Sequence, residues 1–123
     1  MRRSRRFVGI TTVALLLAGC TAPLPQSGPI AVYPRPNAGM DALLTGSLHV
    51  ADGCVAVESE DGAVSIPVFP AGDAEWKDEA LEWRGDVYRE DDTISLGGGY
   101  GGADDGYVPE ACEDAEMFLV SPF

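Results

Sequence analysis

Short runs in which apolar and polar residues alternate, each ended by turn residues, fill the sequence from residue 44 onward. The run Leu44 to Val50 places its leucines on one face and His49 on the other. A period of two is the spacing of a half-buried β-strand. The dipeptides Asp52-Gly53 and Asp61-Gly62 mark hairpin turns after the first two runs. We therefore expect an all-β domain whose first strands pair as a meander.

The number of such runs favours a small closed fold. Residues 73–83 could form a helical turn capped by Asp73, or a strand pair with the segment after Gly85; we favour a strand over 80–83, because Gly85 ends any helix early. Pro67 predicts that the third strand lies at an edge or carries a bulge. Five or six short strands favour a small antiparallel OB-like barrel. The expected strands are 44–50, 54–58, 64–69, 80–83, 92–96 and 116–120.

A glycine-rich stretch follows the fifth of these strands. Six glycines lie between Gly97 and Gly106, which predicts a loop. An adaptable loop on a rigid scaffold is where binding commonly resides. We expect residues 97–107 to recognise a cationic protein patch or a glycan of another envelope component. The predicted contacts are Tyr100 and Tyr107 as rings and Asp104 and Asp105 as polar partners.

The beginning of the chain predicts export. Four arginines in the first six residues precede the mostly apolar run 7–18, which is too short to span a bilayer. The tetrapeptide Leu17-Ala18-Gly19-Cys20 resembles the lipobox of bacterial lipoproteins, in which the cysteine is lipidated and the peptide is cut before it. The resemblance implies a signal peptide over 1–19 and a lipid on Cys20. Ser4-Arg5-Arg6-Phe7 partly resembles a twin-arginine signal, so both that route and general secretion stay open.

The remaining cysteines form an even pair. If Cys20 carries the lipid, Cys54 and Cys112 are left in an oxidising compartment, where paired thiols form disulfides. The bond would connect the beginning of the domain to its end. Two cysteines and one histidine offer too few ligands for a structural metal site.

A proline-rich segment separates the lipidation site from the domain. Residues 21–40 hold five of the nine prolines, which remove backbone donors and favour extended geometry. We expect residues 20–41 to be a disordered tether that lifts a barrel domain of residues 42–123 from the membrane.

Charge and motifs exclude several function classes. The chain after residue 20 contains 20 acidic and four basic residues, a net charge of −16, which excludes binding to nucleic acid. The sequence contains neither a Gly-x-Ser-x-Gly motif nor a phosphate-binding loop. No motif marks a pair of carboxylates as catalytic, and a single histidine leaves little for acid–base chemistry. We expect neither an enzyme nor a cofactor. Calcium binding is an alternative, although the spacing of the candidate oxygen donors does not match an EF-hand loop. These donors are Asp91, Asp92, Asp104 and Asp105.

The spacing of glycines and strands also resembles a protein family. The segments that carry the resemblance are Gly46-Ser47-Leu48, Gly53-Cys54, Ile66 to Pro70, Gly85 to Tyr88 and Asp92 to Gly99. They are similar to a pattern in small actinobacterial secreted or lipid-anchored proteins of unassigned function. The resemblance implies no activity.

These observations together predict a lipoprotein of the cell membrane on its extracytoplasmic face. We expect a non-catalytic binding or interaction module that meets the membrane through its lipid. The alternatives are a structural envelope component, or a calcium-binding or hydrolytic domain.

Overall fold

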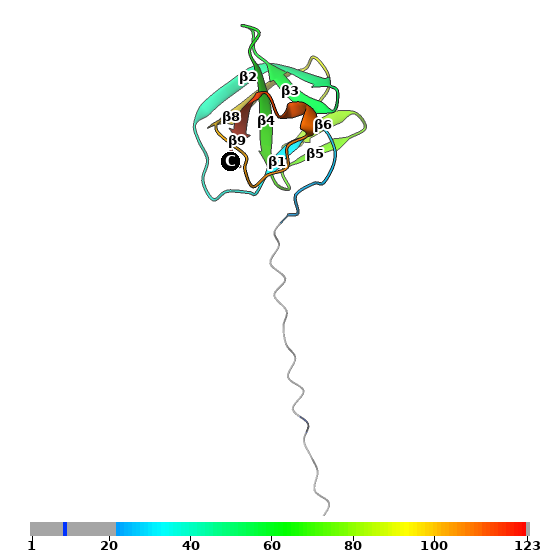
Figure 1. Cartoon of the computed structure of the whole chain (residues 1–123), viewed down its shortest axis with the longest axis vertical. Helices are drawn as coiled ribbons and strands as arrows, with labels where there is room; N and C mark the ends of the chain where they lie inside the picture. The colour runs from blue at the N-terminus through cyan, green and yellow to red at the C-terminus, as the bar shows by residue number, and fades with distance from the viewer. Residues whose placement is uncertain (1–8, 10–21, 123) are drawn as a thin grey trace, which may run out of the picture.

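The computed structural model describes residues 9 and 22–122 and shows an almost all-β chain (Figure 1). Cys20 and the predicted signal peptide, apart from Gly9, lie outside the described residues. Within them, no helix is long and apolar enough to cross a bilayer. The elements are β1 Ala31–Tyr33, β2 Ala42–Ala51, β3 Cys54–Glu58, β4 Val64–Pro70, β5 Ala74–Lys77, β6 Ala80–Trp83, β7 Asp86–Tyr88, β8 Thr93–Tyr100, the 3-10 turn Glu110–Cys112 and β9 Glu116–Val120.

Five strands close into a barrel. The order is β2, β3, β4, β9, β8 and back to β2, and only the β4–β9 pair within this ring is parallel. This connectivity is that of an OB-like barrel, so the expected fold class is confirmed. The expected strands 54–58, 80–83 and 116–120 have the observed bounds of β3, β6 and β9.

The period-two pattern of β2 places its apolar residues inside the barrel. Leu44 and Leu48 are buried, whereas His49 points to the outer face, as predicted. Phe69 and Phe118 are completely buried in the same core. Burying a side chain of this size contributes about 1.5–3 kcal/mol each, so the interior is the main source of stability.

A second, three-stranded sheet lies in the connection between β4 and β8. Its order is β5, β6, β7, with two-residue turns at Asp78-Glu79 and Arg84-Gly85. Both residues of each turn have positive φ, the geometry of tight hairpins. Trp83 is buried, with its ring 5.0 Å from that of Phe69 in the barrel core. The strand interpretation of residues 80–83 is therefore correct, and the helical turn is not present.

The predicted tether contributes a strand to the sheet, which corrects the domain boundary at residue 42. Residues 31–33 form β1, which pairs in parallel with the end of β4. Ile30, Ala31 and Val32 are buried. The apolar run between the prolines thus gains a partner strand and a place in the core, and the extended geometry that the neighbouring prolines favour is compatible with a strand.

Pro67 lies in an interior strand, so of the two alternatives expected for this strand, an edge position or a bulge, the edge position was wrong. Pairing of β3 with β4 ends at Ser65, and pairing of β1 with β4 begins at Val68. On this side of β4, Pro67 falls in the interval between the two partners, so its missing N–H interrupts neither of their ladders; on the other side it is in register with Phe118 of β9.

The glycine-rich run begins inside a strand instead of a loop, a third correction. Gly97 to Tyr100 belong to β8, and the loop starts at Gly101. A Cβ atom on Gly98 would collide with the carbonyl of Leu119 on β9. Glycine therefore serves here to let two barrel strands approach, rather than to make a flexible connector.

The loop 101–115 covers the outer face of β3, β4 and β9. Ile66 and Val68 point outward from β4 and form a second apolar cluster with loop residues such as Val108. Cys54 of β3 and Cys112 of the loop are joined in a disulfide within this cluster, as predicted. The loop is thus attached to the barrel by both packing and a covalent bond.

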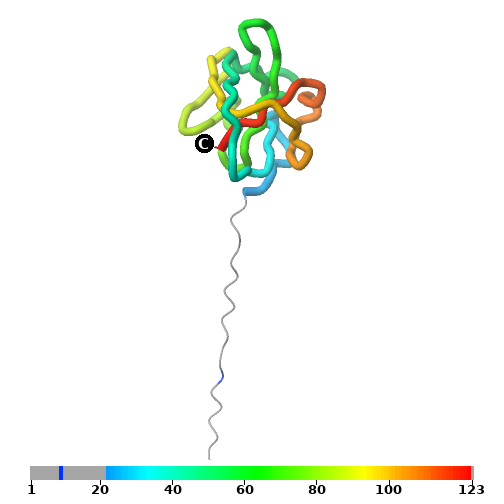
Figure 2. The backbone as a smooth tube through the Cα atoms, turned by 90° about the vertical axis from the view of Figure 1, so that its left-hand side faces the viewer, coloured from blue at the N-terminus to red at the C-terminus, as the bar shows by residue number. Residues whose placement is uncertain are grey.

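The two ends of the barrel differ in what they carry. The hairpin between β3 and β4 extends from one end, and the described chain enters at the other, near residue 22; both views show this (Figures 1 and 2). A ligand at the hairpin end would therefore be far from the point where residues 1–21 join the domain.

Candidate functional site

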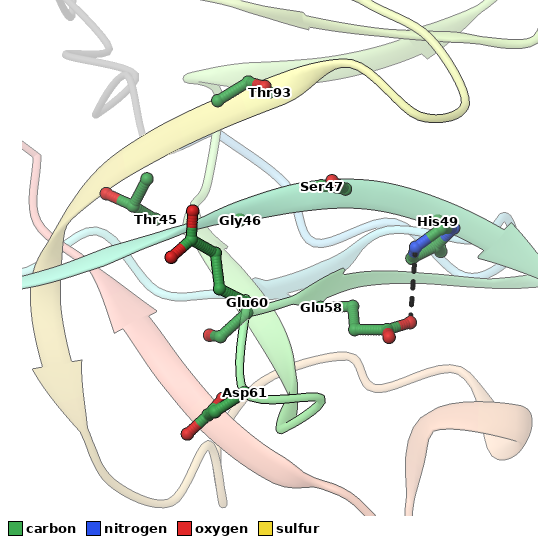
Figure 3. Close-up of a pocket in the computed structure, with 9 residues that line it drawn as sticks. Thr45, Gly46, Ser47, His49, Glu58, Glu60, Asp61 and Thr93 are labelled. Atoms are coloured by element: carbon green, nitrogen blue, oxygen red, sulfur yellow. Dashed lines mark ion pairs between the residues drawn. The ribbon is translucent and has the colours of Figure 1, made fainter.

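A polar hollow of about 730 Å³ lies between β2, the β3–β4 hairpin and the start of β8. Its lining side chains are almost all hydroxyls or carboxyls, and none of the four Arg and Lys side chains in the described part of the chain lines it. Figure 3 shows these side chains along the strands and the hairpin. The polar lining residues are Thr45, Ser47, His49, Glu58, Ser59, Glu60, Asp61 and Thr93. We call this region the acidic hollow.

Strand register explains why these residues share one surface. The tight turn at Asp52-Gly53 sets Ser47 opposite Glu58 and His49 opposite Ala56. Residues two positions apart on a strand share a face, so Ser47, His49 and Glu58 all point outward. At Gly46 the two strands are so close that a Cβ atom would collide with the Glu58 carbonyl.

His49 is surrounded by carboxylates on both sides of its ring. Nε2 lies 3.3 Å from Glu58 Oε2, the ion pair drawn in Figure 3. Nδ1 lies 2.8 Å from Glu90 Oε1 and 3.6 Å from Asp91 Oδ1. Because both ring nitrogens face acidic oxygens, neither is directed at a hydroxyl that it could activate as a base.

The backbone fixes the segment that supplies Glu90 and Asp91. The Asp91 N–H donates to the Leu48 carbonyl at 2.8 Å, and the Leu48 N–H donates to the Asp92 carbonyl at 2.9 Å. The second oxygen of Glu90 accepts the Val50 N–H at 2.6 Å. The connection from β7 to β8 is thus paired with β2 beside His49, which holds the two acidic groups in place.

These contacts shift two pKa values in opposite directions. The hydrogen bond that the His49 ring makes to Glu90 raises the pKa of His49 above 6.5. Desolvation is the next largest effect and opposes this rise, while the charges of Glu90, Glu58 and Asp91 add to it. The hydrogen bonds from His49 and from the Val50 N–H lower the pKa of Glu90 below its usual 4.5. The arrangement favours an imidazolium paired with carboxylates.

Three donor atoms of this cluster also converge. One ligand atom each from His49, Glu90 and Asp91 lies within 4.8 Å of the other two, the one such group found among the described residues. The expected calcium donors Asp92, Asp104 and Asp105 are not part of it. Asp92 Oδ2 instead accepts the Arg89 N–H at 2.7 Å, which stabilises the turn before β8.

The predicted recognition residues of the loop have different partners. The Tyr107 hydroxyl donates to the Gly28 carbonyl at 2.8 Å, and its backbone pairs with Val32. The half-exposed Tyr100 ring packs edge-on against Phe118, 5.2 Å between centroids. Both rings thus contribute to the fold.

The two acidic residues of this loop, Asp104 and Asp105, lie exposed at its turn. A recognition surface on this loop stays a prediction.

The outward position of His49 was predicted from the sequence, whereas its acidic partners were not. The hairpin turn and the strand period would have been a sufficient signal for Glu58. Glu90 and Asp91 approach only through the pairing of a distant connection with β2, for which no local pattern exists.

The fold and the site together describe a closed five-stranded barrel with an acidic hollow between β2, the β3–β4 hairpin and the start of β8. Comparison with protein-family models, curated proteins and solved structures found no match.

Proposed function

We propose that the chain is a lipid-anchored, extracytoplasmic binding protein without catalytic activity, and that the acidic hollow is its recognition surface for a positively charged group of another envelope component. The proposal rests above all on the lining of the hollow, where hydroxyl and carboxyl groups surround His49 and none of the described Arg and Lys side chains is present. Such a surface is complementary to an ammonium or guanidinium group.

The anchor is supported by the lipobox-like residues before and including Cys20. The disulfide between Cys54 and Cys112 fits the same compartment, since disulfides persist outside the cytoplasm. The hairpin that carries Glu60 and Asp61 extends from the end of the barrel opposite the entry of the chain near residue 22 (Figures 1 and 2). An anchor at Cys20 would therefore leave the hollow free to meet a partner.

The covered barrel face favours the hollow over the surface that OB-fold barrels commonly use. Those barrels bind ligands on the outer face of their second and third strands, which here are β3 and β4. In this chain the loop 101–115 packs on that face and is joined to it by the disulfide. The acidic hollow, by contrast, is open.

The anchor is tested by metabolic labelling with a fatty acid. Wild-type protein should incorporate the label and stay with the membrane, whereas Cys20→Ser should incorporate none and be released. Export of an unlabelled wild-type protein would contradict the anchor without affecting the hollow.

Binding at the hollow is tested by quantitative capture from envelope extracts. Glu60→Gln with Asp61→Asn removes two charges from the hollow, and the Asn oxygen can still accept the Ala63 N–H that Asp61 binds. Glu113→Gln with Asp114→Asn removes the same charge from an exposed site near the 3-10 turn. A partner of the hollow should be recovered by the wild type and the control pair only, with an association rate that falls as salt rises through about 0.15 M. Equal recovery by all three proteins would refute this site.

A further inference from the structure

We propose that His49, Glu90 and Asp91 form a binding site for a divalent transition-metal ion such as Zn²⁺, with Glu58 as the residue that orients the imidazole. This inference goes beyond the proposed function, because it requires neither the lipid anchor nor a basic partner. It depends on a mixed set of donors, an imidazole nitrogen between two carboxylates, rather than on acidic residues alone.

The distances between donor atoms fit a single small ion. Ligand atoms about 2.0–2.2 Å from a tetrahedral Zn²⁺ lie roughly 3.4 Å from one another. Nδ1 of His49 is 2.8 Å from Glu90 Oε1 and 3.6 Å from Asp91 Oδ1, on either side of that spacing. The exposed ends of the two acidic side chains can adjust by small rotations. Three protein ligands leave a fourth position for water or for a side chain of a partner.

The opposite nitrogen has the partner that a metal-bound imidazole requires. Metal-binding histidines generally donate their second N–H to a carboxylate or carbonyl, which fixes the tautomer and the orientation of the ring. Here Glu58 Oε2 lies 3.3 Å from Nε2 and comes from β3, a different element from those that supply Glu90 and Asp91. With the proton on Nε2, the lone pair of Nδ1 is directed between Glu90 and Asp91.

The ligands are also held before any ion arrives. The Val50 N–H binds the oxygen of Glu90 that does not face His49, and so leaves Oε1 directed at the ring. Asp91 is attached through its own N–H to the Leu48 carbonyl. Ligands whose backbone or side chain is already hydrogen-bonded to a barrel strand need little reorganisation to bind, which favours affinity.

The test uses the full chain in detergent micelles, without a polyhistidine tag, titrated with Zn²⁺ alone. Because the sequence contains a single histidine, one pair of imidazole nitrogen resonances reports the site without assignment of other residues. We expect one Zn²⁺ per chain, a large shift of the Nδ1 resonance, and an Nε2 that keeps its proton. A folded protein whose imidazole signals do not respond to Zn²⁺ would overturn the proposal.

Variants separate the site from general attraction of cations to an acidic surface. Glu90→Gln and Asp91→Asn should each weaken binding at least about tenfold, and Glu58→Ala by about 10–100-fold, as for other residues that orient ligands. Glu113→Gln and Asp114→Asn make the same chemical changes elsewhere and should leave the affinity unchanged. Equal losses in the site and control variants would mean nonspecific binding and would refute the proposal. Neither Cys20 nor Glu60 and Asp61 is altered, so the outcome is independent of the proposed function.

Discussion

Removal of the disulfide between Cys54 and Cys112 should cost the domain a large part of its stability. The bond closes a loop with a sequence separation of 58 residues. The chain-entropy relation for a loop of this length gives about 4 kcal/mol at 25 °C. Small domains have a total free energy of unfolding of about 5–15 kcal/mol, so the Cys54→Ala, Cys112→Ala variant should be close to the limit of folding.

Two measurements of this loss should agree. The double variant removes the bond together with two sulfur atoms, whereas reduction of unfolded wild-type protein removes the bond alone. Urea unfolding followed by circular dichroism should give a free energy of unfolding lower by about 4 kcal/mol in both cases. A domain of this size should also lose roughly 15–30 °C in melting temperature.

The structure further predicts where the variant becomes mobile. Without the bond, the loop 101–115 is held by its apolar contacts with Ile66 and Val68 and by the hydrogen bonds between Tyr107 and Val32. Amide exchange should therefore increase mainly in residues 108–115, near Cys112, and much less at Tyr107. A loss of stability below about 1 kcal/mol would refute the reasoning, because the unfolded chain would then gain little freedom from losing the crosslink.

Two further predictions concern the pH dependence of stability and the close approach of β8 to β9 at Gly98. In chelator-treated protein, the raised pKa of His49 stabilises the fold fully below about pH 6.5, and this contribution is lost as the pH rises through the higher folded-state pKa. The wild type should therefore melt at a higher temperature than His49→Gln, and the difference should be larger at about pH 5.5 than at about pH 9. An equal difference at both pH values would contradict the ion pair. Gly98→Ala should destabilise the fold by about 1–3 kcal/mol through the collision with Leu119, whereas Gly97→Ala, which meets nothing within 4 Å, should not; equal urea midpoints for the two variants would refute the close approach.

The features that sequence could predict are those set by local rules. Each tight turn fixes the register of its own hairpin, so the Asp52-Gly53 dipeptide and the alternation in β2 were sufficient to place Leu44 and Leu48 inside and His49 outside. The disulfide was predictable because only two cysteines remained once Cys20 was assigned to lipid.

The features that sequence could not predict depend on pairing between distant segments. β1 is a strand only because the end of β4 offers it a parallel partner, which nothing near Ala31 in the sequence indicates. The same holds for Gly98, since the need for a glycine comes from Leu119 on the opposite strand. In both cases composition predicted flexibility, and tertiary contacts overrode it.

The strand β2 links the core to the candidate site. Its inward residues Leu44 and Leu48 fill the barrel, and its outward residues Ser47 and His49 line the acidic hollow. A shift of one residue in register would turn every side chain to the opposite face, so burial of the two leucines also fixes where the imidazole points. Because Leu48 further binds residues 91 and 92 through its backbone, the same residue that anchors β2 in the core holds Asp91 beside His49. The backbone of the His49 cluster is therefore positioned by the same strand that packs into the core, and a binding site requires support of this kind.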